Sequence, residues 1–211
     1  MSGVLALIAS AASSSAGISI VSSATTANTS NGASLVITKP SGIVNGDVLI
    51  SVAHHSTASS TWTPGTGFTE VQDFASQSAG DVARRTVDGT EAATFTLTCS
   101  SATGTLTGGI VAFRNAIFDQ VGTIGGAASP SVAPGITMTG PGIVLAVFSR
   151  NASGITFSTP SGFTPLWSDS DGSAPSIAVF WKAVAAGATG DVSTVPSAAT
   201  ASGYLIGIKS T

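Results

Sequence analysis

Residues 142–149 read Gly-Ile-Val-Leu-Ala-Val-Phe-Ser, a short apolar run that ends in a polar residue. Similar runs recur along the chain, and they are separated by Gly, Pro, Asn, Asp and Ser. Short apolar runs bounded by turn-forming residues are typical of buried β-strands. The clearest of them are Ile18–Ser22, Ser34–Thr38, Asp47–Ala53, Ala93–Thr98, Gly109–Arg114, Gly142–Ser149, Ser176–Lys182 and Gly203–Lys209.

The residue types also favour strands over helices. The 211-residue chain contains 18 Val, 15 Ile and 27 Thr, and far fewer straight-chain helix formers. β-Branched side chains are restricted at χ1 and pack well on a pleated surface. No segment has an apolar stripe with a helical period. We therefore predict an all-β protein, an antiparallel β-sandwich of the jelly-roll-like type.

Related motifs recur in the chain at an offset of 95 or 96 residues. The matched segments are residues 48–50 with 144–146, 63–69 with 159–164, and 109–114 with 204–209. We predict two similar halves, about 17–117 and 136–211, joined by the Gly/Ala/Pro-rich stretch 118–135. A unit of about 95 residues with few aromatics is marginal alone. A single sandwich with pseudo-two-fold symmetry is therefore favoured over two small ones.

Charge and cysteine content exclude several functions. Only 8% of the residues are charged, the net charge is −3, and the seven Lys and Arg are scattered, so we expect no nucleic-acid partner. Cys99 is the single cysteine, which excludes an intrachain disulfide and fits assembly in a reducing cytosol. The apolar run 4–9 is short for a signal peptide, and no run has the ~18 apolar residues of a membrane span. We expect a soluble, unprocessed protein with no membrane partner.

Chemical motifs are few. His54-His55 ends a predicted strand, so the two rings should point to opposite faces, and we favour a structural or subunit-contact role over metal binding. Asp169-Ser-Asp171-Gly172 resembles the start of a calcium loop, but a hairpin turn explains it better. Nucleophile-elbow, P-loop and zinc-protease motifs are not in the sequence. We expect no catalytic residue, no cofactor and no metal site, and so no enzyme.

The three tryptophans are interpreted as packing residues. Trp62 and Phe157 lie within one residue of equivalent positions in the matched segments, and Trp167 and Trp181 lie on predicted strands of the second half. Aromatic side chains on strands commonly anchor a core. Stacking of an exposed aromatic pair on a sugar is the less favoured alternative.

A resemblance extends over residues 17–209. It rests on a Gly-Asp-hydrophobic strand (46–50), a Thr-Pro-x-Gly-aromatic-Thr turn in both halves, an aromatic-Lys-Ala-Val strand (181–184), a Gly-Ala-Thr-Gly turn (187–190) and a closing hydrophobic strand. This layout resembles β-sandwich proteins of tailed-bacteriophage particles, which occur as capsid decoration (cement) proteins and as tail or fibre modules. In this chain the turn aromatic is Phe68 or Phe163 where relatives often have Trp.

The resemblance implies a structural virion protein, assembled in the host cytoplasm, that docks on the phage head and stabilises the shell. Its implied partners are the major capsid protein and copies of itself, as a homo-oligomer with a trimer as one candidate. Residues 1–16 are expected to form an arm, with Ser/Ala/Thr-rich chain giving reach to about Ser34. Val4, Leu5, Leu7 and Ile8 are its candidate partner contacts.

Two other functions remain in view. A tail or fibre module that binds a host receptor or glycan predicts exposed aromatics and measurable sugar affinity. A β-sandwich glycan hydrolase predicts a cleft with two close carboxylates, and no acidic motif in the sequence singles out such a pair. The short chain favours decoration.

Overall fold

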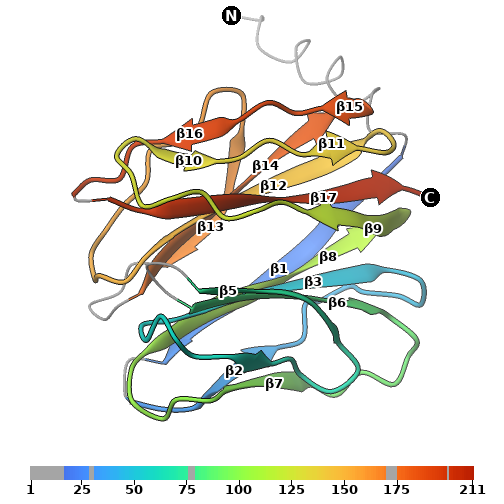
Figure 1. Ribbon diagram of the computed structural model, residues 1–211. Helices are drawn as coiled ribbons and strands as arrows, with labels where there is room; N and C mark the ends of the chain where they lie inside the picture. Colours follow the sequence, from blue (N-terminus) through green and yellow to red (C-terminus); the bar gives the residue numbers. More distant parts are fainter. Residues whose placement is uncertain (1–16, 29–30, 76–78, 170–174, 199) are drawn as a thin grey trace, which may run out of the picture.

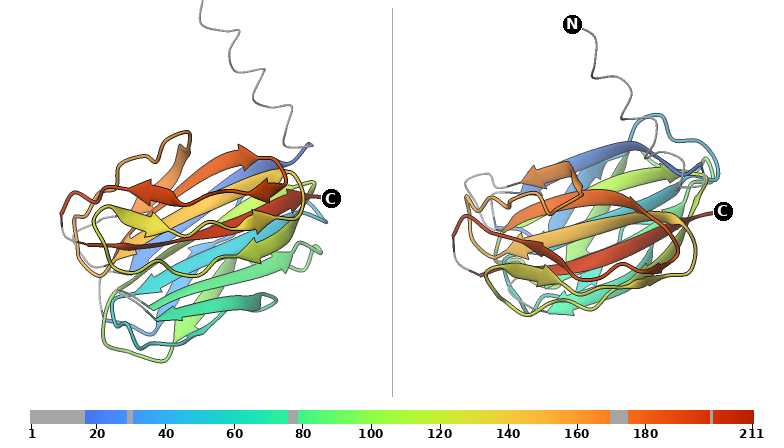
Figure 2. Two further views of the ribbon diagram at one scale, coloured as in Figure 1. Left: turned by 45° about the horizontal axis from the view of Figure 1, so that its top comes forward. Right: turned by 90° about the horizontal axis from the view of Figure 1, so that it is seen from above.

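The computed structural model describes residues 17–28, 31–75, 79–169, 175–198 and 200–211. Its strands form two central five-stranded antiparallel sheets, and shorter strands cover the outer face of each (Figures 1 and 2). The predicted all-β, antiparallel sandwich is confirmed. Among these residues, no helix is long and apolar enough to cross a membrane.

The first half contains one central sheet and one outer sheet. The central sheet has the order β1-β8-β3-β6-β5, and the outer sheet has the order β2-β7-β4. Their bounds are β1 (Ser19–Asn28), β2 (Ser34–Thr38), β3 (Val48–His55), β4 (Trp62–Thr63), β5 (Thr69–Ala75), β6 (Ala79–Thr86), β7 (Thr94–Cys99) and β8 (Leu106–Arg114).

The second half follows a similar plan. Its central sheet has the order β13-β14-β12-β17-β9, and its outer layer consists of the two-stranded ribbons β10–β16 and β11–β15. Their bounds are β9 (Ala116–Val121), β10 (Ser131–Ala133), β11 (Thr137–Met138), β12 (Gly142–Arg150), β13 (Thr164–Asp169), β14 (Ser176–Val184), β15 (Gly187–Ala188), β16 (Val192–Thr194) and β17 (Ser202–Ser210).

The two central sheets have the same strand order when their strands are matched along the chain. In the first sheet, the middle strand β3 lies between β8 and β6. In the second sheet, the middle strand β12 lies between β17 and β14, which are the corresponding strands in chain order. The approximately 95-residue sequence repeat stays a prediction, but the common topology is a property of the structure.

Three apolar cores hold the four layers of strands together. One core lies between the two central sheets, and one lies between each central sheet and its outer layer. The layers themselves are visible in Figure 1. All eight residues of β3 are buried, because both of its faces are covered. Val48, Ile50 and Val52 pack in the core between the sheets, whereas Leu49 and Ala53 pack under the outer sheet.

The stretch predicted to connect the two halves contains paired strands. The stretch 118–135 is not only a connection, because it carries most of β9 and all of β10, which pair with β17 and β16. The change of half falls at Asn115, which has a positive φ of 55° between β8 and β9. β9 mixes apolar and polar residues and β10 has only three residues, so no strong apolar period marks them.

The N-terminal tract also differs in part from its prediction. Residues 19–28 are not part of an arm that reaches a neighbouring subunit, because they form β1, which pairs along its length with β8. Small Ser, Ala and Thr side chains are compatible with an edge strand, where half of the surface faces water. Residues 1–16 lie outside the described residues.

Candidate functional site

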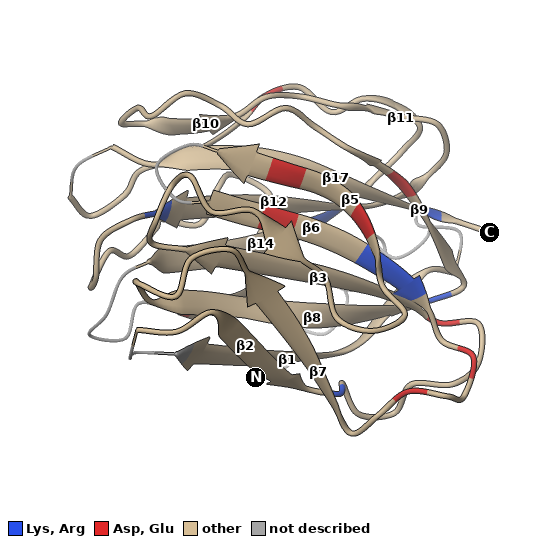
Figure 3. Cartoon of the chain, turned by 60° about the horizontal axis from the view of Figure 1, so that its bottom comes forward, with Lys and Arg blue, Asp and Glu red and all other residues tan. Residues whose placement is uncertain are grey.

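Charged side chains are distributed unevenly over the layers. In the described strands they all belong to the two central sheets, and the strands of the outer layers contain no Lys, Arg, Asp or Glu (Figure 3). Two central-sheet cations are paired internally, with N–O distances of 2.9 Å from Arg114 to Asp47 and 3.4 Å from Lys209 to Asp119. The strands of both outer layers therefore present uncharged side chains.

The outward side of β2, β7 and β4 is an ordered array of hydroxyl side chains around one valine. Buried and exposed residues alternate along β2 and β7, as strand geometry requires. Val36 is 50% exposed and lies opposite Thr96, while Ser34 lies opposite Thr98. We call this surface the threonine face; it consists of Ser34, Val36, Thr38, Thr63, Thr94, Thr96 and Thr98.

The outer layer of the second half has a similar chemistry. Thr137, Ala188 and Ser193 are exposed there, and Val195, just beyond β16, is 54% exposed. The molecule therefore carries two outer layers whose strands have no charged residue, one on each side of the pair of central sheets (Figures 1 and 2).

The residues expected to contact a partner, Val4, Leu5, Leu7 and Ile8, lie outside the described residues. The same holds for 170–174, which follow Asp169 in the loop that resembles a calcium site. Asp169 itself ends β13 and accepts a hydrogen bond of 2.6 Å from Thr107 Oγ1, which joins the two halves. β13 and β14 pair as antiparallel neighbours, as a hairpin requires.

The two histidines at the end of β3 contact opposite sides of the sheet. His54 Nε2 lies 3.1 Å from the Tyr204 hydroxyl of β17, and His55 Nδ1 accepts a hydrogen bond of 2.9 Å from the Thr57 N–H. His55 also makes an edge contact with Trp62. Both rings are fully buried, and burial lowers the pKa of His54 to about 3 and lowers that of His55. Both are therefore neutral packing groups at pH 7.

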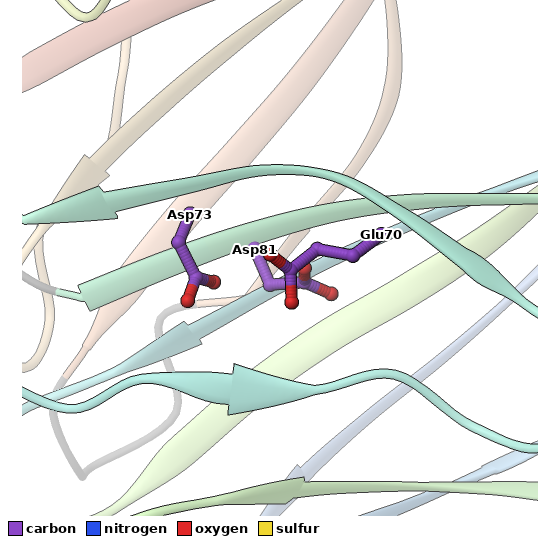
Figure 4. Close-up of side chains that lie close together, drawn as sticks. All are labelled: Glu70, Asp73 and Asp81. Carbon is purple, nitrogen blue, oxygen red and sulfur yellow. The ribbon is translucent and has the colours of Figure 1, made fainter.

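Three carboxylates meet between the edge of the first central sheet and β4 (Figure 4). Glu70 and Asp73 come from β5 and Asp81 from β6, and one oxygen of each lies within 4.8 Å of the others. Glu70 is exposed, Asp73 is half-buried and Asp81 has no exposed surface. Asp73 Oδ2 accepts a hydrogen bond of 3.2 Å from the Trp62 N–H of β4.

Burial and mutual repulsion change the protonation of this cluster. Burial raises the pKa of Asp81 to about 8, and the negative charges of Asp73 and Glu70 contribute to the increase. Burial also raises the pKa values of Asp73 and Glu70. At neutral pH and without a counter-ion, Asp81 therefore retains its proton.

Sequence reasoning missed this cluster because only the strand register brings its members together. Glu70, Asp73 and Asp81 lie in a part of the chain where the sequence shows no clear apolar run. The useful signal is the presence of acidic residues on β5 and β6, which face one another across an antiparallel pair. A β-bulge between Glu70 and Gln72 then decides which face each side chain takes, and the sequence does not indicate it.

The tryptophans pack against the apolar cores. Trp62 is 4% exposed in the outer core of the first half, and Trp167 and Trp181 pack partly buried against the central core. A pocket of about 280 Å³ lies beside β13 and β14. Its lining includes Ile155, Thr156, Phe157, Thr159, Pro165, Leu166, Trp167, Ser168, Ala178 and Phe180.

Comparisons with protein-family models, curated proteins and solved structures gave no match to this chain. The resemblance to phage virion proteins therefore rests on the sequence motifs alone.

Proposed function

We propose that this protein is a structural component of a phage particle, a capsid decoration protein that docks on the shell through an outer layer whose strands carry no charge. The observation that carries the proposal is the distribution of charge: the described strands of both outer layers have no charged residue. A protein that stays free in solution usually covers its surface with mixed charges, which keep molecules apart. An uncharged surface is suited to permanent burial against a partner, because no charge has to be desolvated.

The threonine face is the docking surface in this proposal. Its side chains are short and mostly β-branched, so little side-chain entropy is lost when they are buried. Their hydroxyls donate and accept, so each can pair with backbone groups of the shell. Val36, half exposed in β2, supplies apolar area. The major capsid protein is the proposed partner, and copies of this chain as a homo-oligomer complete the assembly in the virion.

The buried position of Asp81 is the reason that we do not propose a carbohydrate-cleaving enzyme. A glycosidase needs two carboxyl groups that both contact the scissile bond. Asp81 has no exposed surface, so a sugar cannot contact it in this conformation.

A tail or fibre module is the second candidate function, and the pocket beside β13 favours it. Phe157 and Phe180 line that pocket together with the polar residues Thr156, Thr159 and Ser168. Aromatic rings beside hydroxyl groups are the usual means of holding a sugar ring. A calorimetric titration with host glycans tests this reading, because decoration alone predicts no heat of binding.

A charge placed on the threonine face tests the decoration proposal. Thr96→Lys would force an unpaired ammonium group into the contact, so we expect co-sedimentation with particles stripped of this protein to weaken at least about tenfold. Thr86→Lys is the matched control, because Thr86 is an exposed threonine on the central strand β6. Equal co-sedimentation of the wild type and Thr96→Lys would contradict docking through this face.

A further inference from the structure

The register of the β5–β6 hairpin puts three carboxylates on one face. Asp73 lies directly opposite Asp81. The bulge between Glu70 and Gln72 inserts one residue, so Glu70 lies opposite Ala83. Residues two apart on a strand share a face, and so do opposed residues of an antiparallel pair. Glu70, Asp73 and Asp81 therefore share a face because of the bulge, and bulges often redirect side chains in this way.

Several buried oxygens in this region have no hydrogen-bond partner. Asp81 is 0% exposed and neither of its carboxylate oxygens is hydrogen-bonded, and Asp73 Oδ1 is also buried without a partner. Ser51 on β3 is 1% exposed, and its Oγ also has no hydrogen-bond partner. Ser51 lies opposite Ala83, so it shares the face of Asp81. Buried polar groups are nearly always paired, so this group of oxygens indicates a missing partner.

A single bound cation would give these oxygens the partner that they lack. Buried carboxylates held close together repel one another and are costly to ionise. A positive ion among them supplies the opposite charge and accepts their lone pairs, as metal ions do in proteins. Carboxylate and hydroxyl oxygens are hard ligands, which select Ca²⁺ or Mg²⁺ rather than zinc or copper.

We propose that Glu70, Asp73 and Asp81 bind a divalent cation, and that this cation is Ca²⁺. Ca²⁺ accepts irregular arrangements of six to eight oxygens, whereas Mg²⁺ requires a near-ideal octahedron, and a bulged strand pair offers an irregular set. Trp62 N–H holds Asp73 Oδ2, which leaves Oδ1 for the ion. The exposed Glu70 marks the side from which the ion enters.

The bound ion would connect two layers of the first half. Asp81 and Glu70 belong to the central sheet, and Asp73 is joined through its hydrogen bond to Trp62 of β4 in the outer sheet. β5 is the edge strand of its sheet, and β4 is a two-residue edge strand of the other. Ca²⁺ would therefore tie two weakly held edges together and stabilise the fold under the threonine face.

Terbium luminescence tests the site directly, since Tb³⁺ replaces Ca²⁺ and emits when a nearby tryptophan is excited. The full chain is titrated with Tb³⁺, and the melting temperature is measured in millimolar Ca²⁺, in Mg²⁺ and in EDTA. We expect sensitised emission that excess Ca²⁺ displaces, and a melting temperature that is higher in Ca²⁺ than in EDTA. Trp62→Phe should lose most of the emission and keep the Ca²⁺-dependent rise, because the Trp62 backbone N–H binds Asp73 and its indole Nε1–H donates to the carbonyl of Ala79, two residues before Asp81.

Asp81→Asn is the decisive variant, because it is isosteric and removes a ligand charge. It should weaken Tb³⁺ and Ca²⁺ binding at least about tenfold and abolish the Ca²⁺-dependent rise in melting temperature. Asp191→Asn is the matched control, since Asp191 binds the Gly135 N–H in the second half, and it should bind as the wild type does. If Asp81→Asn does not fold, Glu70→Gln replaces it, because Glu70 is exposed. It should weaken Tb³⁺ and Ca²⁺ binding in the same assays, but by a smaller factor.

Three outcomes would overturn the proposal. The first is a wild type with neither sensitised emission nor a Ca²⁺-dependent melting temperature. The second is a response that Asp81→Asn and Glu70→Gln retain in full, which would place the ion elsewhere. The third is a melting temperature that rises in the presence of Mg²⁺ but not of Ca²⁺, which would overturn the choice of metal.

Discussion

Asp81 on β6 is fully buried beside two other acids, and this position makes the stability of the fold sensitive to pH. In EDTA, the folded chain keeps the Asp81 proton up to about pH 8, whereas the unfolded chain releases it near pH 4. The folded state therefore binds more protons in this range. We expect the free energy of unfolding to fall between pH 6.5 and pH 8 by up to about 1.4 kcal/mol per pH unit.

The control for this prediction is Asp81→Asn, measured by urea denaturation at the same pH values. The buried His54 acts in the opposite direction below pH 6.5, because the unfolded state takes a proton that the folded ring, with a pKa of about 3, refuses. The two effects oppose one another there, so the window above pH 6.5 is the informative one. A wild-type stability that does not change in that window, or falls equally in Asp81→Asn, would contradict the assignment.

At the scale of elements, the long central strands could be predicted and the short outer ones could not. The expected strand Gly142–Ser149 is β12, and Ser176–Lys182 is most of β14, because long apolar runs with β-branched residues are unmistakable. The ribbons β10–β16 and β11–β15 have two or three residues per strand, too few to show a period. Their pairing depends on tertiary contacts that no local pattern encodes.

In the candidate site, too, some features could be predicted from the sequence and others could not. The positions of His54 and His55 on opposite faces follow from strand alternation and could be predicted. Acidic residues on both β5 and β6 are a signal for the acidic cluster, but the bulge that brings Glu70 onto the face of Asp81 is not indicated by the sequence. The uncharged outer layers were visible only as an overall scarcity of charge, because the sequence does not say which strands form the outside.

Two adjacent glycines test how tightly the segment after β9 is held. A Cβ on Gly125 would lie 1.9 Å from the carbonyl oxygen of Val132, whereas a Cβ on Gly126 would meet no atom within 4 Å. Because backbone cannot move aside cheaply, we expect Gly125→Ala to lower the free energy of unfolding by about 1–3 kcal/mol. Gly126→Ala should change it by less than about 0.5 kcal/mol. Equal urea midpoints for the two variants would contradict this packing.

At the scale of the whole molecule, the core between the central sheets should make the two halves unfold together. Leu145 of β12 is fully buried in that core. We expect Leu145→Ala to lower the free energy of unfolding by about 2–5 kcal/mol. Calorimetry should then show a single transition with a lower midpoint temperature. The calorimetric and van't Hoff enthalpies should agree for the wild type and the variant. Two separate transitions, with only one shifted by the substitution, would show that the halves are independent domains.

As a whole molecule, we propose, the protein is a structural component of the virion, docked through an outer layer whose strands carry no charge. The most direct test is the copy number of this chain in purified particles of a phage whose genome encodes it, measured by quantitative mass spectrometry against the major capsid protein. For a decoration protein we expect a number comparable to that of the shell subunit. A few copies per particle would instead place the protein in the tail and favour receptor binding, and its absence from particles would rule out a role in the virion.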